Sequence, residues 1–219
     1  MNFFAHATLA LWRSDAPRFV FGSMLPDFAG MLGVRVLRVD DAELASGVAF
    51  HHATDAAFHQ APAFVGLCEQ GILTLEAAGV GRGTARAVAH VGTELLLDGA
   101  LSHDQRALQV YATTLATAQR ERFVQSLALP APEHSERFHL ALGRLANAPV
   151  PHGYRDPAFV VARLRGALER RPRLAIRDQD VVSVERFVRD IQPRVERVWP
   201  QLREQVRAGL TPNTEPAHS

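Results

Sequence analysis

GVAFHHATDAAFH, residues 47–59, carries three imidazoles and a carboxylate in an otherwise apolar stretch. If the stretch is helical, His51, Asp55 and His59 recur at four-residue intervals along one face, whereas His52 points away from them. Neutral imidazoles together with a carboxylate suit zinc, manganese or iron(II), because calcium and magnesium prefer oxygen ligands alone. The stretch therefore predicts one half of a metal site on a helix.

A second apolar stretch, residues 86–101, repeats this spacing with His90, Glu94 and Asp98. Burying an unpaired carboxylate is costly, so we expect the two helices to turn these faces toward each other and hold metal between them. His6, in an apolar opening segment, and Asp27, beside Pro26, are further candidates.

The candidate groups divide by expected role. We expect the metal ligands to be His6, Asp27, His51, Asp55, His90 and Asp98. Glu94 is a ligand or a general base, and His52 and His59 orient ligands or donate a proton to a leaving oxygen. Because one ion does not need so many groups, we expect more than one ion of manganese, zinc or iron, or that some groups only support the ligands. The alternative is a set of buried polar residues paired with one another.

Length and patterning predict one all-α domain. The chain has 219 residues, long enough for one sizeable core. Apolar segments of helical length are separated by proline- and glycine-containing breaks, with no useful β alternation. We expect a single-domain helical bundle over residues 1–210, followed by a disordered tail at 211–219. We also expect Thr84 to cap the helix after it, and Pro26, Pro193 and Pro200 to break or kink helices.

Charge and cysteine content narrow the class of partner. A formal net charge of +1 argues against a general nucleic-acid binder. One cysteine excludes a disulfide framework and fits a reducing compartment. The start lacks a basic leader region and no segment is apolar enough to span a bilayer, so we expect a cytoplasmic protein that does not enter a membrane.

An arginine block stands in the more basic C-terminal region, RRPR at residues 170–173. Arg170, Arg171 and Arg173 could bind a substrate phosphate or an acidic carrier protein through forked hydrogen bonds. The other interpretation is a structural block that ends a helix, because arginine is also common on solvated surfaces. Both interpretations stay open.

Several segments occur in the order known from one family. MNFFAHATLA at residues 1–10 and FGSMLPDF at 21–28 resemble the opening of bacterial acyl-carrier-protein phosphodiesterases, a branch of the HD-type metal-dependent hydrolases. The resemblance continues with Gly47, HHATD at 51–55, DGALS at 98–102 and RRPRL at 170–174, and so spans most of the chain. It implies an HD-domain-like helical fold, a divalent cation, commonly manganese, and hydrolysis of the phosphodiester between 4'-phosphopantetheine and a carrier-protein serine.

By position in this resemblance, His6, Asp27, His51, Asp55 and Asp98 take the places of the metal-site residues. The chain also departs from the pattern. The histidine expected directly after the last aspartate is Gly99, the earlier histidine on the central helix is Ala49, and His59 and His90 stand where the family has other residues.

The order of these ligand-type residues is also similar to that of zinc-dependent phospholipase C and related nucleases. His51 and Asp55 form a His-x-x-x-Asp pair, and His90 and Glu94 form a His-x-x-x-Glu pair. The N-terminal tryptophan ligand and the export signal of those secreted enzymes are missing. This second resemblance implies a metal phosphoesterase site without specifying its substrate.

Three functional hypotheses follow. The first is a phosphodiesterase that uses metal-bound hydroxide on acyl carrier protein or another phosphopantetheine-like substrate. The second is another HD-type or zinc-dependent phosphoesterase acting on a nucleotide or small phosphoester. The third is a non-catalytic helical metal-binding or interaction protein, for which Gly99 is the best argument.

Overall fold

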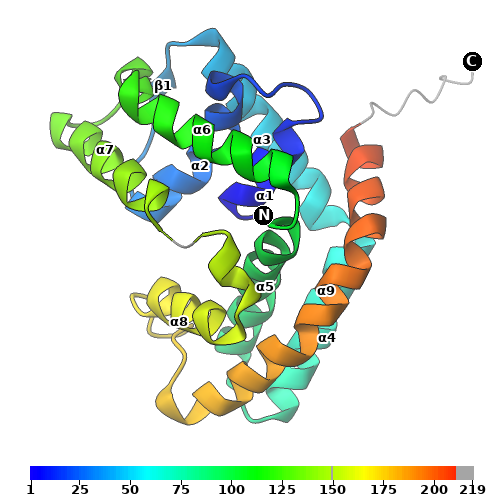
Figure 1. The fold of residues 1–219 in the computed structure, drawn as a ribbon. Coiled ribbons are helices and arrows are strands. Elements are labelled where there is room, and N and C mark those ends of the chain that lie inside the picture. Colours follow the sequence, from blue (N-terminus) through cyan, green and yellow to red (C-terminus); the bar gives the residue numbers. More distant parts are fainter. Residues whose placement is uncertain (149, 211–219) are drawn as a thin grey trace, which may run out of the picture.

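Helices make up almost all of the regular structure in the computed structural model, which describes residues 1–148 and 150–210 (Figure 1). In this part of the chain the α-helices are α1 (Phe3–Ala10), α2 (Pro17–Leu32), α3 (Ala42–Gln60), α4 (Pro62–Ala77), α5 (Arg82–Leu101), α6 (Gln105–Arg120), α7 (Pro132–Ala146), α8 (Pro157–Leu168) and α9 (Val181–Leu210). The two short strands β1 (Arg38–Val39) and β2 (Leu127–Ala128) pair antiparallel, with Arg38 opposite Ala128. The all-α prediction is confirmed, and the predicted tail at 211–219 lies outside the described residues.

Local sequence explains where several helices begin. Asp41 precedes α3, and its side chain accepts a hydrogen bond from the backbone N–H of Leu44 at 2.9 Å. Asp104 caps α6 in the same way through Ala107. Such caps satisfy N–H groups that the first turn of a helix leaves free. Pro62 opens α4, where its missing N–H has no consequence.

The expected Thr84 cap was wrong, and Pro26, Pro193 and Pro200 do not break their helices. Thr84 does not cap α5, which begins at Arg82 after Gly81; its hydroxyl instead donates to the carbonyl of Ala175 at 3.1 Å. Pro26 lies inside the continuous helix α2, and α9 likewise continues past its two prolines. A proline removes one hydrogen bond from a helix, and burial of the apolar face of α9 offsets that loss.

The backbones of α2 and α3 come into direct contact where these helices cross. A Cβ atom added at Gly47 would lie 2.2 Å from the carbonyl oxygen of Phe19 and 2.9 Å from the Cα of Gly22. A Cβ at Gly22 would lie 2.2 Å from the carbonyl oxygen of Leu44. The two backbones therefore touch, and only glycine permits this at the crossing. This contact brings Asp27 of α2 and His51 of α3 toward the same point.

The helix α5 passes through the middle of the fold, and α1, α4, α8 and α9 pack against it (Figure 1). The short helix α1 is almost entirely buried, because it is apolar on every side. Its only ionisable side chain, His6, is therefore carried into the interior. Within the described residues, no helix has an apolar stretch long enough to cross a bilayer.

Candidate metal centre

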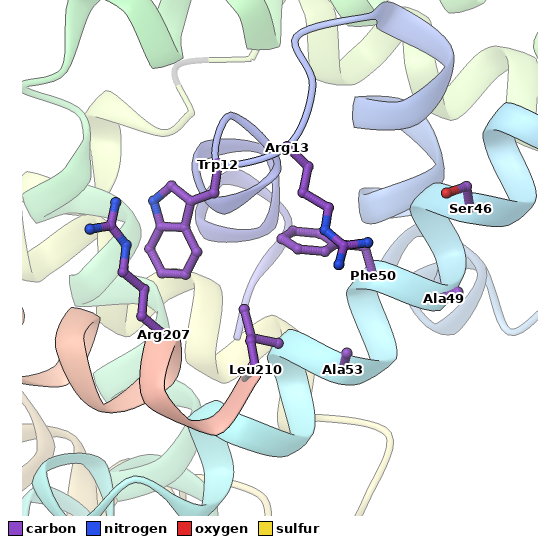
Figure 2. A pocket seen from close by; sticks show the side chains of 8 residues that line it. All are labelled: Trp12, Arg13, Ser46, Ala49, Phe50, Ala53, Arg207 and Leu210. Atoms are coloured by element: carbon purple, nitrogen blue, oxygen red, sulfur yellow. The ribbon is translucent and has the colours of Figure 1, made fainter. Parts of the chain in front are cut away.

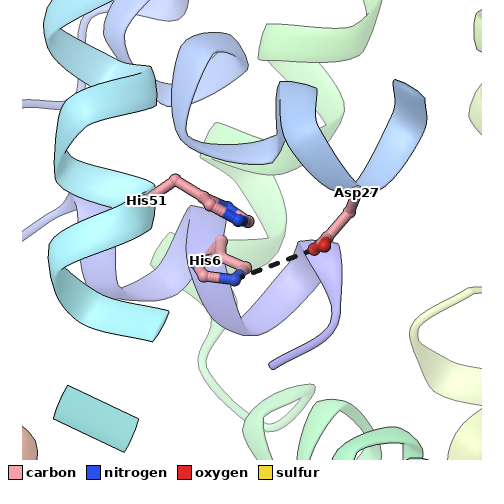
Figure 3. Close-up of side chains that lie close together, drawn as sticks. All are labelled: His6, Asp27 and His51. Carbon is pink, nitrogen blue, oxygen red and sulfur yellow. Dashed lines mark ion pairs between the residues drawn. The ribbon is translucent and has the colours of Figure 1, made fainter. Parts of the chain in front are cut away.

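Three helices bring His6, Asp27 and His51 together, and we call these residues the buried group (Figure 3). Each offers one ligand atom, and these atoms lie within 4.8 Å of one another. The ring of His6 stacks on that of His51 with centroids 3.9 Å apart. His6 is fully buried, whereas the side chain of Asp27 is 25% exposed. The buried group is thus closed on its inner side and open beside Asp27.

Two atoms of the buried group lack the hydrogen bonds that buried polar atoms normally make. His6 Nε2 and Asp27 Oδ2 are 3.8 Å apart, and neither has a hydrogen-bond partner among the described residues. That distance is too long for a hydrogen bond. His51 Nδ1 lies 2.9 Å from the carbonyl oxygen of Ser23, to which it donates, so its Nε2 keeps a free lone pair. Free lone pairs converging in a buried place are what a cation would satisfy.

Burial sets the protonation state of this group. Desolvation lowers the pKa of His6 to about 3 and that of His51 to about 4. Both imidazoles are therefore neutral at neutral pH, the form that binds metal. Desolvation also raises the pKa of Asp27 to about 7, because a buried carboxylate is unfavourable without a cation.

The outer group consists of His59, near the end of α3, with His90 and Glu94 of α5. The Nε2 atoms of the two histidines are 3.1 Å apart, and each lies 3.1 Å from Glu94 Oε1. His59 Nδ1 lies 2.9 Å from the backbone carbonyl of Asp55. When His59 Nδ1 donates to this carbonyl, Nε2 of the neutral His59 ring carries a lone pair that points at His90 Nε2. A proton or a cation must then lie between these two nitrogens.

The outer group favours positive charge. Hydrogen bonds to Asp55 and Glu94 raise the pKa of His59 to about 9 despite its partial burial. In the metal-free protein that charge is a proton on His59, and a divalent cation could replace it. The side chain of His90 is 43% exposed, so this group faces solvent.

Asp55 lies between the two groups. Its Oδ1 is 3.6 Å from His6 Nε2, and its Oδ2 is 3.2 Å from His59 Nδ1. Although burial opposes it, the nearby His59, His6 and α-ammonium of Met1 hold the pKa of Asp55 well below its usual range. One carboxylate therefore contacts both groups, through the Nε2 of His6 in the buried group and through the Nδ1 of His59 in the outer group.

The α-ammonium of Met1 is a functional group that sequence reasoning missed. It is buried and lies 2.9 Å from Asp55 Oδ1 and 3.1 Å from Glu94 Oε1. Burial disfavours the charged amine, but Glu94 and Asp55 outweigh burial and raise its pKa. The ammonium therefore lies between the two carboxylates and offsets part of their negative charge.

Asp98 belongs to neither group among the described residues. It is fully buried, and its oxygens accept from the backbone N–H of Ala5 at 2.8 Å and from Asn2 Nδ2 at 2.7 Å. Desolvation raises its pKa to about 8. These contacts fix the start of α1 and so position His6 in the buried group. Its direct ligation of metal stays a prediction.

The remaining predicted residues lie at the periphery. His52 is exposed, and its ring meets the ring of His51 edge-on at 5.2 Å. The arginine block follows α8 with all three side chains exposed. The backbone carbonyl of Arg173 lies against the start of α5, since a Cβ at Gly83 would come within 2.6 Å of it. Gly83 is about 10 Å from His90 along the helix axis. The block therefore has a structural contact and also presents free guanidinium groups.

Packing explains the glycine that follows Asp98. A Cβ at Gly99 would lie 2.5 Å from the carbonyl oxygen of Tyr154, in the short 3-10 helix η2 (His152–Arg155). No side chain fits between α5 and η2 at this distance. The histidine expected here from the family resemblance is thus excluded by the way η2 packs.

Together the buried group and the outer group form two possible metal-binding sets in one place. His6, Asp27, His51, Asp55, His59, His90 and Glu94 converge as ligand-type residues. No protein-family model matches the chain, and searches of the curated proteins and of the solved structures found no match either.

Proposed function

We propose that this protein is a metal-dependent phosphoesterase, with a phosphodiester as its preferred substrate. The observation that carries the proposal is the convergence of two sets of ligand atoms, the buried group and the outer group, with the carboxylate of Asp55 beside both. Two cations about 4 Å apart stabilise both the attacking and the leaving oxygen of a phosphoryl transfer. A set of neutral imidazoles and carboxylates suits manganese, zinc or iron(II).

The ions, when bound, supply Lewis acidity and lower the pKa of water. The chain's own residues provide the rest. The buried group fixes the inner position through three different helices, so its geometry is rigid. The outer group faces solvent at His90, and a phosphate would approach from that side. His59 has a raised pKa and can hold a proton for a leaving oxygen when it is not a ligand.

For the substrate, we propose the 4'-phosphopantetheine diester of acyl carrier protein, on the basis of the sequence resemblance. The exposed guanidinium groups of Arg170, Arg171 and Arg173 would suit an acidic carrier protein. A nucleotide or small phosphoester is the second candidate. It is favoured by His59 and His90, which complete the outer group at positions where the acyl-carrier-protein phosphodiesterases have other residues.

The test begins with metal content. Protein purified in manganese or zinc is analysed by elemental mass spectrometry and assayed with bis(p-nitrophenyl) phosphate. We expect metal at one or more equivalents, and turnover that chelation abolishes. Asp55→Ala should remove that turnover while the helical circular dichroism persists. Asp190→Ala, at an exposed position on α9, is the matched control and should retain full turnover.

Holo acyl carrier protein then separates the two substrates. Loss of the phosphopantetheine mass supports the first candidate, and turnover of other phosphoesters with an unchanged carrier mass supports the second. Stoichiometric metal without any phosphoesterase turnover would leave a non-catalytic metal-binding protein. Absence of metal, with stability unaffected by chelation, would overturn the proposal as a whole.

A further inference from the structure

A pocket of about 540 Å³ lies where the ends of α1 and α9 meet the side of α3 (Figure 2). Trp12, Phe50 and Leu210 supply its apolar surfaces. Besides Phe50, α3 contributes the small side chains of Ser46, Ala49 and Ala53, which leave the space open. This volume lies within the range of roughly 300–1,000 Å³ that is usual for small-molecule sites.

Two arginines complete the lining. The guanidinium of Arg207 lies over the ring of Trp12, with its carbon 4.7 Å from the ring centroid, and that of Arg13 lies over Phe50 at 5.5 Å (Figure 2). Stacking occupies the flat face of a guanidinium and leaves the N–H groups on its edge free to donate. Each arginine is thus held in place while keeping donors for an anion.

The charge of the lining is unbalanced. Among the described residues, the lining includes these two arginines and no carboxylate. Within residues 1–148 and 150–210, Arg207 pairs with Glu204 at 3.9 Å, and Glu204 is itself 62% exposed and closer to Arg203. Exposed ion pairs of this length contribute little. The positive charge of the pocket therefore remains available to a ligand.

The pocket is separate from the metal centre. A helix turns by about 100° per residue, so two residues along α3 turn by about 200°. Ala49 and Ala53 precede His51 and Asp55 by two positions each. The two sets of side chains therefore leave α3 on opposite sides. Binding in the pocket does not require metal, and it can be measured in metal-free protein.

We propose that this pocket binds an amphipathic anion, namely a flat apolar body that carries a carboxylate or phosphate. The apolar body packs between Trp12 and Phe50, and the anionic group accepts hydrogen bonds from Arg13 and Arg207. Forked donors match both oxyanions, and ionised hydrogen bonds are the strong ones. The small residues of α3 make room for the body.

Calorimetry on the metal-free full chain tests this proposal with 2-naphthoate as the probe. We expect saturable one-to-one binding, and affinity at least about tenfold weaker for the uncharged 2-naphthalenemethanol. Binding of 2-naphthyl phosphate in the same protein shows which oxyanion the pocket prefers. Saturable binding of neither anion up to millimolar concentration would overturn the proposal.

Variants locate the binding. Arg13→Gln and Arg207→Gln should each lower the affinity for 2-naphthoate by about tenfold. Arg203→Gln, on the same helix but outside the lining, is the matched control and should change affinity less than twofold. Ala53→Leu fills the pocket and should abolish binding, while circular dichroism and the unfolding temperature check its fold. Equal affinities in the three arginine variants would show that the probe binds elsewhere.

Discussion

Replacing Gly47 with alanine should separate α2 from α3 and weaken both stability and metal binding. The added Cβ would lie 2.2 Å from the carbonyl oxygen of Phe19, whereas ordinary contacts begin at 3.4 Å. The contact is with backbone, so no side chain can rotate to relieve it. The helices must therefore part by about 1 Å at this crossing.

The magnitude follows from two opposing effects. Overpacking costs roughly 1–3 kcal/mol, and a rigid backbone contact belongs at the upper end. Alanine stabilises a helix by about 1 kcal/mol relative to glycine, which offsets part of this cost. The net loss of about 2 kcal/mol should lower the unfolding temperature by about 4–8 °C for a chain of this size. His51 lies one turn beyond Gly47, so its displacement from Asp27 should lower metal affinity by about tenfold or more.

Thermal unfolding of metal-free protein and metal titration of each variant measure these effects. Gly66→Ala is the matched control, because Gly66 lies inside α4 and an added Cβ meets nothing within 4 Å. It should raise stability by up to about 1 kcal/mol and leave metal affinity unchanged. A Gly47→Ala protein as stable as the wild type, with undiminished metal affinity, would refute the reasoning.

Three further predictions concern the metal centre. Asp98→Ala leaves the buried N–H of Ala5 without its acceptor and should cost about 1–3 kcal/mol in metal-free protein, measured by urea unfolding; an unchanged midpoint would contradict the anchoring role. Burial lowers the pKa of His51 to about 4, so its neutral form stabilises the folded state above pH 6.5, and that stability is lost as the pH falls from 6.5 toward 4. In metal-free protein, His51→Gln should accordingly reduce the change of unfolding free energy with pH in that window by up to about 1.4 kcal/mol per pH unit. An unaltered slope would show that His51 does not titrate in this way. Chelation of metal-loaded protein should lower the unfolding temperature by about 5 °C or more. Metal at a hundred times its dissociation constant stabilises the folded state by about 2.7 kcal/mol, and this stabilisation is lost on chelation. The Asp55→Ala protein should show a smaller shift.

The local pattern predicted the fold class and much of the candidate site. Four-residue spacing of ligand-type side chains is a property of the helix itself, so the shared faces of α3 and α5 could be read from residue order. The apolar character of α1 indicated that His6 would be buried. Prolines were less informative, because tertiary packing kept α2 and α9 continuous through them.

Spacing alone could not divide the ligands between groups. The sequence placed His90 and Asp98 on one face of one helix, yet only His90 joins the outer group. Asp98 lies beside α1, where its carboxylate accepts a hydrogen bond from the backbone N–H of Ala5. The position of each turn of α5 relative to its neighbours decides that Glu94 joins the outer group whereas Asp98 accepts from the backbone.

The sequence by itself determined that the chain is helical and that His51 and Asp55 share a face with His59, because helix geometry connects residues four apart. Tertiary structure alone decided that Asp55 joins two groups, that the ammonium of Met1 lies between Asp55 and Glu94, and that Gly99 cannot carry a side chain. These features depend on how closely helices distant in the chain approach one another. That approach is set by glycine contacts and by the packing of the whole core.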